Sequence, residues 1–299
     1  MEFGIRSEIG KLRSVLMHRP GEEIKKVTKE TLHQYHFRAV PNLAKMQDEF
    51  DDFTAVLKEN NVEVVFLESL TEDTHSPNLY FTRDIASITE KGLIVMNMGA
   101  EGRRNEPKII KNALKKMIPV HVEIKKPGLL EGGDLVYIDD DALGIGFGPR
   151  SNLQGVKKLI SKMKRTSIKE IVLIPLPSFR VHLDGAFMFV DNHLAVVHEP
   201  SINQQRAQII QGNSSKKEPF LDYLRWKGIR TITVTDEETK LFGPNLLSIG
   251  SGKVISYEWN TRIIKELEKR GLDVITIKGK ELVKGGGGPH CMTCPILRD

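Results

Sequence analysis

The sequence predicts an α/β fold, a five-bladed pseudo-symmetric α/β propeller in which one strand–strand–helix–strand unit repeats around an axis. Two observations support this prediction. The same order of elements recurs four times at intervals of roughly 50–60 residues, a period typical of propellers and other repeat arrays. In addition, the parts of a fifth unit stand at the two ends of the chain. An open α/β sheet is the alternative interpretation of the same elements.

The four complete units are recognised by their strands and helices. Each strand is an apolar, β-branched run bounded by turn residues, and each helix has apolar residues three and four positions apart. The expected first strands are residues 85–89, 135–138, 186–190 and 246–250, and the second strands are 93–98, 143–147, 194–198 and 254–258. The closing strands are 120–124, 170–176, 231–235 and 273–277. The helices lie near 109–117, at 152–163, before residue 226 and at 261–270.

The fifth unit is split between the two ends of the chain. Residues 12–18 form an expected strand, 42–59 a helix and 62–67 another strand, and the missing strand would come from 291–297. We therefore expect residues 1–299 to form a single catalytic domain whose terminal segments complete one blade.

Composition and charge exclude several classes of function. The chain has 299 residues and is 39% hydrophobic, so it can bury a large core. Its net charge of +5 is spread along the chain without a basic stripe, and we do not expect nucleic-acid binding. The pairs Lys164-Arg165 and Lys216-Lys217 are expected to be exposed charges. No apolar run approaches the ~20 residues of a membrane span, so no membrane association is expected.

The sequence contains two cysteines, Cys291 and Cys294. Two cysteines cannot form a disulfide scaffold, and their scarcity favours a cytoplasmic location. A redox pair or half of a metal site is an alternative interpretation of this spacing. No second pair exists to complete a zinc site, and the flanking pattern is not the strand-to-helix pattern of a thioredoxin-type motif. We expect neither a metal nor a cofactor.

Reactive side chains stand at the start of the first strand of successive units. They are Asp84, Glu131, His182 and Asp184, and Cys291 starts the closing strand after a run of glycines. Equivalent positions in a pseudo-symmetric ring surround one axis, so these groups should converge. Taken singly, Asp84 also fits a turn residue and His182 a structural histidine.

This set of side chains suits one kind of reaction. A thiol needs a positive neighbour or a base to be nucleophilic at neutral pH, and His182 can act as either. Acyl transfer calls for donors to an oxyanion, not for surplus carboxylates. A planar guanidinium, by contrast, pairs with carboxylates through two N–H groups. We therefore infer that Cys291 attacks the carbon of an amidine or guanidine.

Five motifs together resemble the arginine deiminase branch of the guanidino-group modifying enzymes, the amidinotransferase superfamily with a five-bladed α/β propeller. In chain order they are MHRP (17–20), PNLYFTRD (77–84), EGGD (131–134), HLD (182–184) and GGPHCM (287–292). They cover nearly the whole chain. The resemblance implies L-arginine as a small-molecule partner and is compatible with a homo-oligomer.

The resemblance also implies a role for each motif residue. Cys291 attacks the guanidinium carbon, and His182 protonates the departing ammonia and then activates water, which yields citrulline. Asp84 and Asp184 hold the guanidinium nitrogens, while Glu131 orients His182 and the substrate. The further substrate contacts that it implies are Asn78, Phe81, Arg103 and Arg150, of which the two arginines bind the α-carboxylate.

Three departures from the family pattern leave alternatives open. The helical insertion that precedes PNLYFTRD in bacterial arginine deiminases is absent, and Gly286 replaces an arginine that contacts substrate and gates the thiol. The His-Cys-x-Thr-Cys ending at 290–294 resembles the amidinotransferases, although Glu131 favours hydrolysis. The sequence thus predicts an L-arginine deiminase. The alternatives are an amidinotransferase, a dimethylarginine hydrolase, an arginine dihydrolase, and a non-catalytic propeller like the ribosome-binding translation factors.

Overall fold

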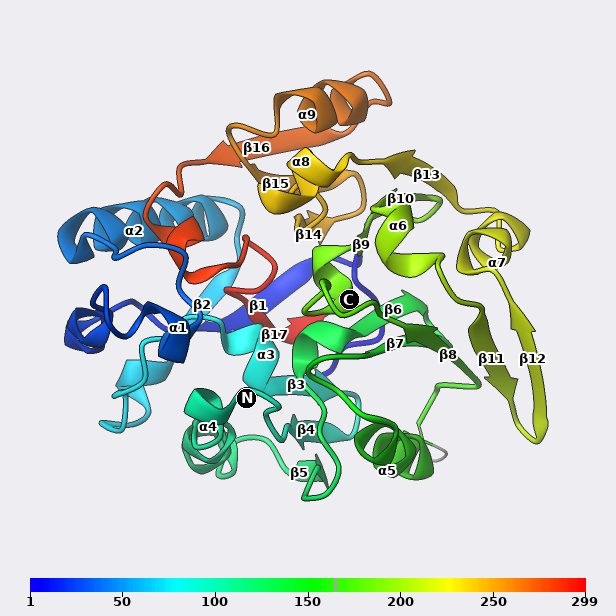
Figure 1. The fold of residues 1–299 in the computed structure, drawn as a ribbon, viewed down its shortest axis with the longest axis horizontal. Coiled ribbons are helices and arrows are strands. Elements are labelled where there is room, and N and C mark those ends of the chain that lie inside the picture. Colours follow the sequence, from blue (N-terminus) through cyan, green and yellow to red (C-terminus); the bar gives the residue numbers. More distant parts are fainter. Residues whose placement is uncertain (164–165) are drawn as a thin grey trace.

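The computed structural model describes residues 1–163 and 166–299, so the basic pair Lys164-Arg165 lies outside the described residues. These described residues have an α/β fold in which the strands form five sheets, four with three strands and one with five. In Figure 1 these sheets lie around a common centre, with the longer helices at the periphery. Among the described residues, no helix combines the length and the apolar character needed to cross a membrane.

Three of the sheets share one pattern of pairing. The first strand pairs antiparallel with the second, and the closing strand pairs parallel with the second. The strands are β3 (Ala86–Thr89), β4 (Gly92–Val95) and β5 (Val120–Glu123); β9 (Phe187–Asp191), β10 (Leu194–Val197) and β13 (Arg230–Thr233); and β14 (Leu247–Gly250), β15 (Lys253–Tyr257) and β16 (Asp273–Ile277). The helices before the closing strands are α4 (Glu106–Leu114), α7 (Phe220–Trp226) and α9 (Thr261–Glu268). The predicted elements of these units are confirmed to within a few residues.

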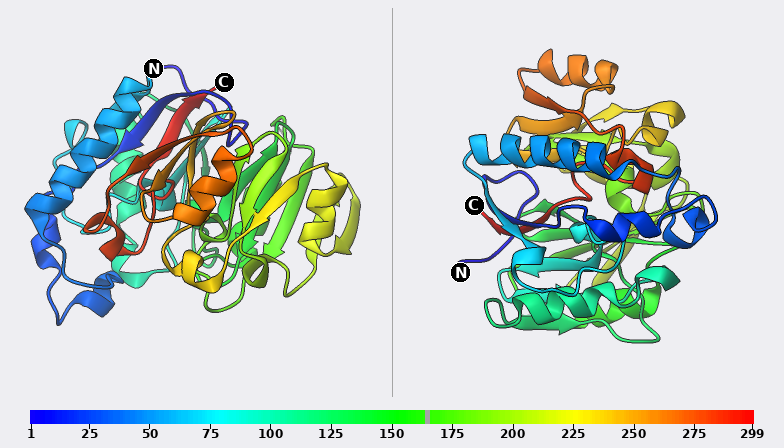
Figure 2. Two further views of the ribbon diagram at one scale, coloured as in Figure 1. Left: turned by 90° about the horizontal axis from the view of Figure 1, so that it is seen from above. Right: turned by 90° about the vertical axis from the view of Figure 1, so that its left-hand side faces the viewer.

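The two ends of the chain share one sheet. Its central strand, β1 (Leu12–Met17), pairs antiparallel with β17 (Cys294–Arg298) and parallel with β2 (Glu63–Phe66). Helix α2 (Leu43–Glu59) connects β1 to β2. Figure 2 shows the two chain ends close together on one side of the molecule. Because β17 follows Cys291 within a few residues, this pairing anchors the segment that carries the cysteine.

The remaining sheet contains a hairpin that the sequence analysis did not predict. Strands β6 (Leu135–Asp139), β7 (Ala142–Phe147) and β8 (Glu170–Pro175), with helix α5 (Leu153–Met163), are as predicted. The hairpin of β11 (Ala207–Gln211) and β12 (Ser214–Glu218) extends this sheet, because β11 pairs antiparallel with β8. Strand β12 is polar and exposed, Lys216 and Lys217 included, so it lacks the apolar alternation that signals a strand. The short helices are α1 (Leu32–Tyr35), α3 (Thr82–Ile85), α6 (Glu199–Ile202) and α8 (Asp236–Lys240).

The helices and inner strands bury their apolar side chains between the sheets. Ile110 and Leu114 of α4, and Ile263 and Leu267 of α9, are fully buried at helical spacing. Each such side chain contributes about 1.5–3 kcal/mol by leaving water. Strands β3 and β4 are buried along their whole length, which fixes the starts of the strands where the reactive residues lie.

Candidate active site

One pocket at the starts of the first strands contains most of the predicted site residues. Seven of them line it: Asn78, Phe81, Asp84, Arg103, Arg150, His182 and Cys291. The other lining residues are His36, Arg38, Val181, Gly285, Gly286 and Gly287, which the sequence analysis did not assign to substrate. Glu131 and Asp184 lie behind the pocket wall, with exposed fractions of 0% and 1%. The structure therefore brings all the predicted groups together, in two layers.

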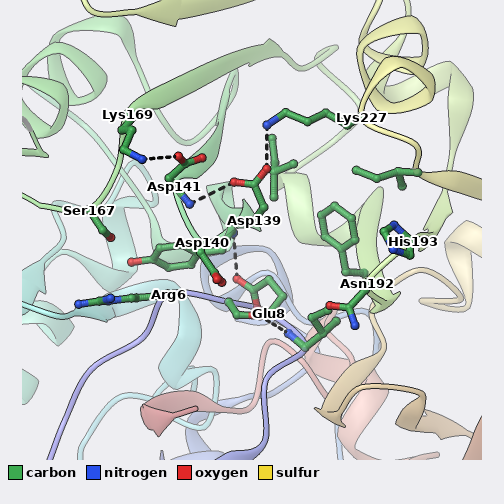
Figure 3. A pocket seen from close by; sticks show the side chains of 16 residues that line it. Arg6, Glu8, Asp139, Asp140, Asp141, Ser167, Lys169, Asn192, His193 and Lys227 are labelled. Atoms are coloured by element: carbon green, nitrogen blue, oxygen red, sulfur yellow. Dashed lines mark hydrogen bonds and ion pairs between the residues drawn. The ribbon is translucent and has the colours of Figure 1, made fainter.

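A larger pocket elsewhere contains none of the predicted residues (Figure 3). Two of its acidic side chains, Asp139 and Asp141, are already paired with lysines. Asp139 Oδ2 lies 2.7 Å from Lys227 Nζ, and Asp141 Oδ2 lies 3.0 Å from Lys169 Nζ. Among the described residues, its lining includes no cysteine. This pocket therefore lacks the nucleophile that the proposed chemistry needs.

Short turns place the charged groups around the first pocket. Two 3-10 turns, Gly132–Asp134 and Leu183–Gly185, precede β6 and β9, and α3 precedes β3. Glu131 and His182 are the extended residues directly before the two turns, and Asp84 lies within α3. Equivalent places in three sheets thus supply the side chains that meet.

His182 is held between two carboxylates. Its Nε2 lies 2.7 Å from Glu131 Oε2, and its Nδ1 lies 3.5 Å from Asp84 Oδ1. Burial acts to lower the pKa of His182, but Asp84 and Glu131 raise this pKa to about 10. Burial acts to raise the pKa of Glu131, but the hydrogen bond to His182 and its charge lower that pKa to about 2. At neutral pH His182 is therefore an imidazolium that can donate a proton.

Cys291 faces the pocket beside Asp184. Its Sγ lies 3.4 Å from Asp184 Oδ2, and its backbone N–H donates to Asn245 Oδ1 at 3.2 Å. Burial raises the pKa of the Cys291 thiol well above its ordinary value, and the charges of Asp184 and Asp84 add to the effect. The thiol is therefore protonated in the free enzyme. A cation bound beside these two carboxylates would offset their charge and favour the thiolate.

A chain of buried polar residues behind Asp184 was missed by the sequence analysis. His290 Nδ1 lies 2.9 Å from Asp184 Oδ2, and His290 Nε2 lies 3.4 Å from Glu8 Oε2. Burial acts to raise the pKa of Asp184, but the hydrogen bond to His290 lowers it, so Asp184 stays ionised. The position of His290 next to Cys291 was a signal in the sequence. Glu8 and Asn245 carry no such signal, because they reach the site from distant segments.

The two predicted arginines differ in their surroundings. Arg103 is buried; its Nη1 donates to Asp84 Oδ2 at 2.5 Å and its Nε to Glu106 Oε2 at 2.8 Å. Arg150 is paired less closely, because its Nη1 lies 3.7 Å from Glu131 Oε1, and its side chain is 14% exposed.

Ligand atoms of Asp84, Glu131 and His182 also lie within 4.8 Å of one another, a spacing at which a metal ion could bind. A metal would require neutral His182, whose pKa is raised to about 10, and would compete with Arg103 for Asp84. This arrangement favours a proton and a guanidinium at the site over a metal ion.

The two glycines of EGGD are required by close packing. A Cβ atom on Gly132 would lie 2.0 Å from the carbonyl oxygen of Arg83. A Cβ atom on Gly133 would lie 2.8 Å from Cγ and Nδ1 of His182. The motif therefore serves the site, because it lets the turn approach the imidazole.

Gly133→Ala is expected to lower kcat/KM by about 10- to 100-fold, because the added methyl group displaces His182 from Glu131 and Asp84. Steady-state kinetics measure the loss, and thermal unfolding checks that the variant is folded. Gly250→Ala is the matched control, since a Cβ there meets nothing within 4 Å. An unchanged kcat/KM for Gly133→Ala would contradict the packing argument.

A thiol, an imidazolium and several carboxylates around one pocket define a hydrolase that acts on the C–N bonds of linear amidines. The chain belongs to the arginine deiminase family, whose model matches residues 74–298. It is 27% identical to arginine deiminase 1 of Staphylococcus epidermidis over 402 aligned positions, which cover 99% of this chain and 98% of that protein. It is 26% identical to the arginine deiminase of Listeria monocytogenes, with the same coverage. These alignments are longer than the 299-residue chain, so the relatives contain segments that it lacks.

Solved structures of other proteins share the fold. A dimethylarginine dimethylaminohydrolase variant from Pseudomonas aeruginosa, complexed with citrulline, aligns with a TM-score of 0.75 at 20% identity, over 96% of this chain and 100% of that one. The N-terminal domain of ArgZ, a cyanobacterial arginine dihydrolase bound to its product, aligns with a TM-score of 0.76 at 17% identity, over 96% of this chain and 98% of that one.

Proposed function

We propose that this enzyme is an L-arginine deiminase, which hydrolyses free arginine to citrulline and ammonia through a covalent amidino group on Cys291. The observation that carries this proposal is a pair of buried acceptor atoms in the pocket that holds the thiol. Asp84 Oδ1 and Asn78 Oδ1 accept no hydrogen bond from the described residues. A guanidinium carries five N–H donors in one plane and would satisfy such acceptors. Curated members of the family are named arginine deiminases, which agrees with this choice.

In the first half-reaction, the guanidinium lies beside Asp84 and Asp184, and its charge favours loss of the Cys291 proton to water, from which the released ammonia later takes it up. The thiolate forms a bond to the guanidinium carbon, which gives a tetrahedral adduct. His182 donates its proton to a terminal nitrogen, the C–N bond breaks and ammonia leaves. An amidino-cysteine remains.

In the second half-reaction, water attacks the amidino carbon and the now neutral His182 accepts its proton. The C–S bond then breaks, citrulline leaves and the thiol regains a proton. Glu131 holds the imidazole in place through both halves. The sum consumes water and releases ammonia.

The His-Cys-x-Thr-Cys ending has a structural explanation that weakens the amidinotransferase alternative. His290 contacts Asp184, and Thr293 Oγ1 donates to the carbonyl oxygen of His290 at 3.1 Å. Cys294 Sγ is buried 3.5 Å from the carbonyl oxygen of Ala86. None of the residues His290, Thr293 and Cys294 lines the pocket. These three residues therefore offer no contact to an acceptor amine in the pocket, which favours water as the second nucleophile.

The proposed substrate-binding residues are Asn78, Phe81, Asp84, Arg103, Arg150 and Asp184. We also propose that the five sheets are the blades of a closed five-bladed propeller, and that residues 1–299 form one catalytic domain.

Product analysis tests the function directly. We expect incubation with L-arginine to yield citrulline and ammonia in equal amounts, with no change when glycine is added as an acceptor amine. Mass spectrometry of the products makes the measurement. Ornithine without an acceptor would instead indicate double hydrolysis, and ornithine that depends on glycine would indicate amidino transfer.

A further inference from the structure

A buried chain of three ionisable side chains ends at the nucleophile. Asp184 Oδ2 is shared by two residues that are neighbours in the sequence, since it lies 2.9 Å from His290 Nδ1 and 3.4 Å from Cys291 Sγ. On the far side of the ring, His290 Nε2 lies 3.4 Å from Glu8 Oε2. The side chains of Glu8, His290 and Asp184 are 2%, 1% and 1% exposed, so these contacts are shielded from water. A change at Glu8 can therefore reach Asp184 through His290.

Glu8 is fixed in place and ionised. Its Oε1 accepts the Tyr137 backbone N–H at 3.2 Å, and Arg83 Nη1 lies 4.0 Å from its Oε2. Burial acts to raise the pKa of Glu8, but the hydrogen bond to His290 and the charges of Arg83 and Arg298 lower that pKa to about 2. Glu8 is therefore a carboxylate at neutral pH.

His290 thus lies between two ionised carboxylates. An ionised carboxylate only accepts hydrogen bonds, so each of the two contacts requires an N–H on the ring. With both nitrogens protonated, the ring is a cation. Burial acts to raise the pKa of Asp184, but the hydrogen bond to His290 and the charge of that ring lower it. His290 therefore stabilises the carboxylate that faces the Cys291 thiol.

Other charged or titratable groups surround the two ends of this chain. They are Arg83, Arg298 and Tyr137 near Glu8, and His182, Arg83, Arg180 and Cys291 near Asp184. Among the described residues, His290 alone forms hydrogen bonds with both Glu8 and Asp184. Glu8 precedes β1 and His290 precedes β17, so the pairing of these two strands keeps Glu8 and His290 together.

We propose that Glu8 is a positioning residue for the reaction: through His290 it holds the Asp184 carboxylate toward Cys291 and toward the substrate guanidinium. The proposal rests on the proposed function, because it places a guanidinium beside Asp184. Glu8 itself touches no reacting atom. Its effect is to keep a charged donor, rather than a neutral one, against Asp184.

The test follows the turnover of L-arginine by the intact enzyme as a function of pH. Glu8→Gln keeps the shape of the side chain, and its oxygen can still accept the Tyr137 N–H. The amide group then faces His290 Nε2 and favours the neutral ring. We expect kcat/KM to fall by about 10- to 100-fold, because a hydrogen bond from a charged donor is replaced by a weaker one.

The acid limb of the kcat/KM profile should also move to higher pH in Glu8→Gln. In the wild type the lowered pKa of Asp184 keeps this carboxylate ionised until the pH falls through that pKa. Beside a neutral His290 the pKa of Asp184 is higher, so the ionised form is lost at higher pH. Profiles between pH 4 and pH 8 measure the shift, and thermal unfolding checks that the variant is folded.

His290→Asn is a second variant whose effect should be coupled to the first. The asparagine amide can replace Nδ1–H as a donor to Asp184, but it is uncharged and too short to reach Glu8. We expect the same direction of shift in the acid limb. The double variant should lose no more activity than His290→Asn alone, because the two residues act in one chain. Losses that multiply would show that Glu8 acts independently of His290, which would overturn the proposal.

Glu23→Gln is the matched control. The buried His18 also lies between two carboxylates, with its Nε2 3.2 Å from Glu23 Oε1 and its Nδ1 2.9 Å from Glu68 Oε2, and none of the three lines the pocket. This variant should keep the wild-type kcat/KM and acid limb. If the wild type does not consume L-arginine, the proposed function is wrong and the role of Glu8 falls with it. If it does, and Glu8→Gln keeps the wild-type acid limb, the assignment of Glu8 is wrong while the function stands.

Discussion

Cys291→Ser is expected to lower the turnover of L-arginine by about 10⁴-fold or more. A serine hydroxyl is far less acidic than a thiol, and the charges of Asp184 and Asp84, which already raise the pKa of the thiol, also oppose the formation of an alkoxide. His182 is already protonated at neutral pH, so it cannot serve as a base for the hydroxyl. Ammonia release from L-arginine and mass spectrometry of the quenched enzyme make the measurement. The wild type should show the amidino adduct and the variant should not.

Cys294→Ser is the matched control for this prediction. Cys294 is buried three positions along the chain, but its Sγ contacts the carbonyl oxygen of Ala86 and does not line the pocket. We expect this variant to keep most of its activity. A dispensable Cys291 with an essential Cys294 would show that the nucleophile has been assigned to the wrong cysteine.

Glu131→Gln is expected to lower kcat by about 10²- to 10⁴-fold and to move the alkaline limb of the pH–rate profile to lower pH. Glu131 Oε1 accepts the backbone N–H groups of Gly99 and Ala100 at 2.8 and 3.2 Å, and these donors will hold the oxygen of a glutamine. The Nε2 group of the glutamine then faces His182 Nε2, which favours the neutral imidazole.

The direction of the pH effect follows from the pKa of His182. In the wild type this pKa is raised to about 10, so the protonated form that ammonia release requires is lost only as the pH rises through that value. Without the charge of Glu131 the pKa falls, and the protonated form is lost at lower pH. Profiles of kcat/KM between pH 6 and pH 10.5 measure the shift. Glu170→Gln is the control, because Glu170 is also a buried carboxylate but binds Lys227 at 3.1 Å, away from the pocket. An alkaline limb that stays in place would contradict the coupling between Glu131 and His182.

The hairpin of β11 and β12 could not be predicted from the pattern of apolar residues. Strands such as β3 and β15 can be recognised in the sequence, because their buried apolar side chains recur at strand spacing. Strand β12 has the sequence SSKKE and faces solvent, so pairing with β11 alone makes it a strand. Strand β12 pairs with its neighbour in the chain, β11, and β11 in turn pairs with the distant β8. These backbone hydrogen bonds leave no mark in the side-chain pattern of β12.

The same limit applies to the site that contains Cys291. The sequence by itself determined that Cys291, His182, Glu131 and two aspartates should meet, because repeated units place equivalent residues around one centre. The tertiary structure alone decided which atoms touch. It put Asp184 behind the thiol, turned Arg103 onto Asp84 and brought Arg38 to the pocket from the N-terminal segment. A repeat determines which backbone positions surround the common centre. The partners of each side chain depend instead on distances of a few ångströms between segments far apart in the chain.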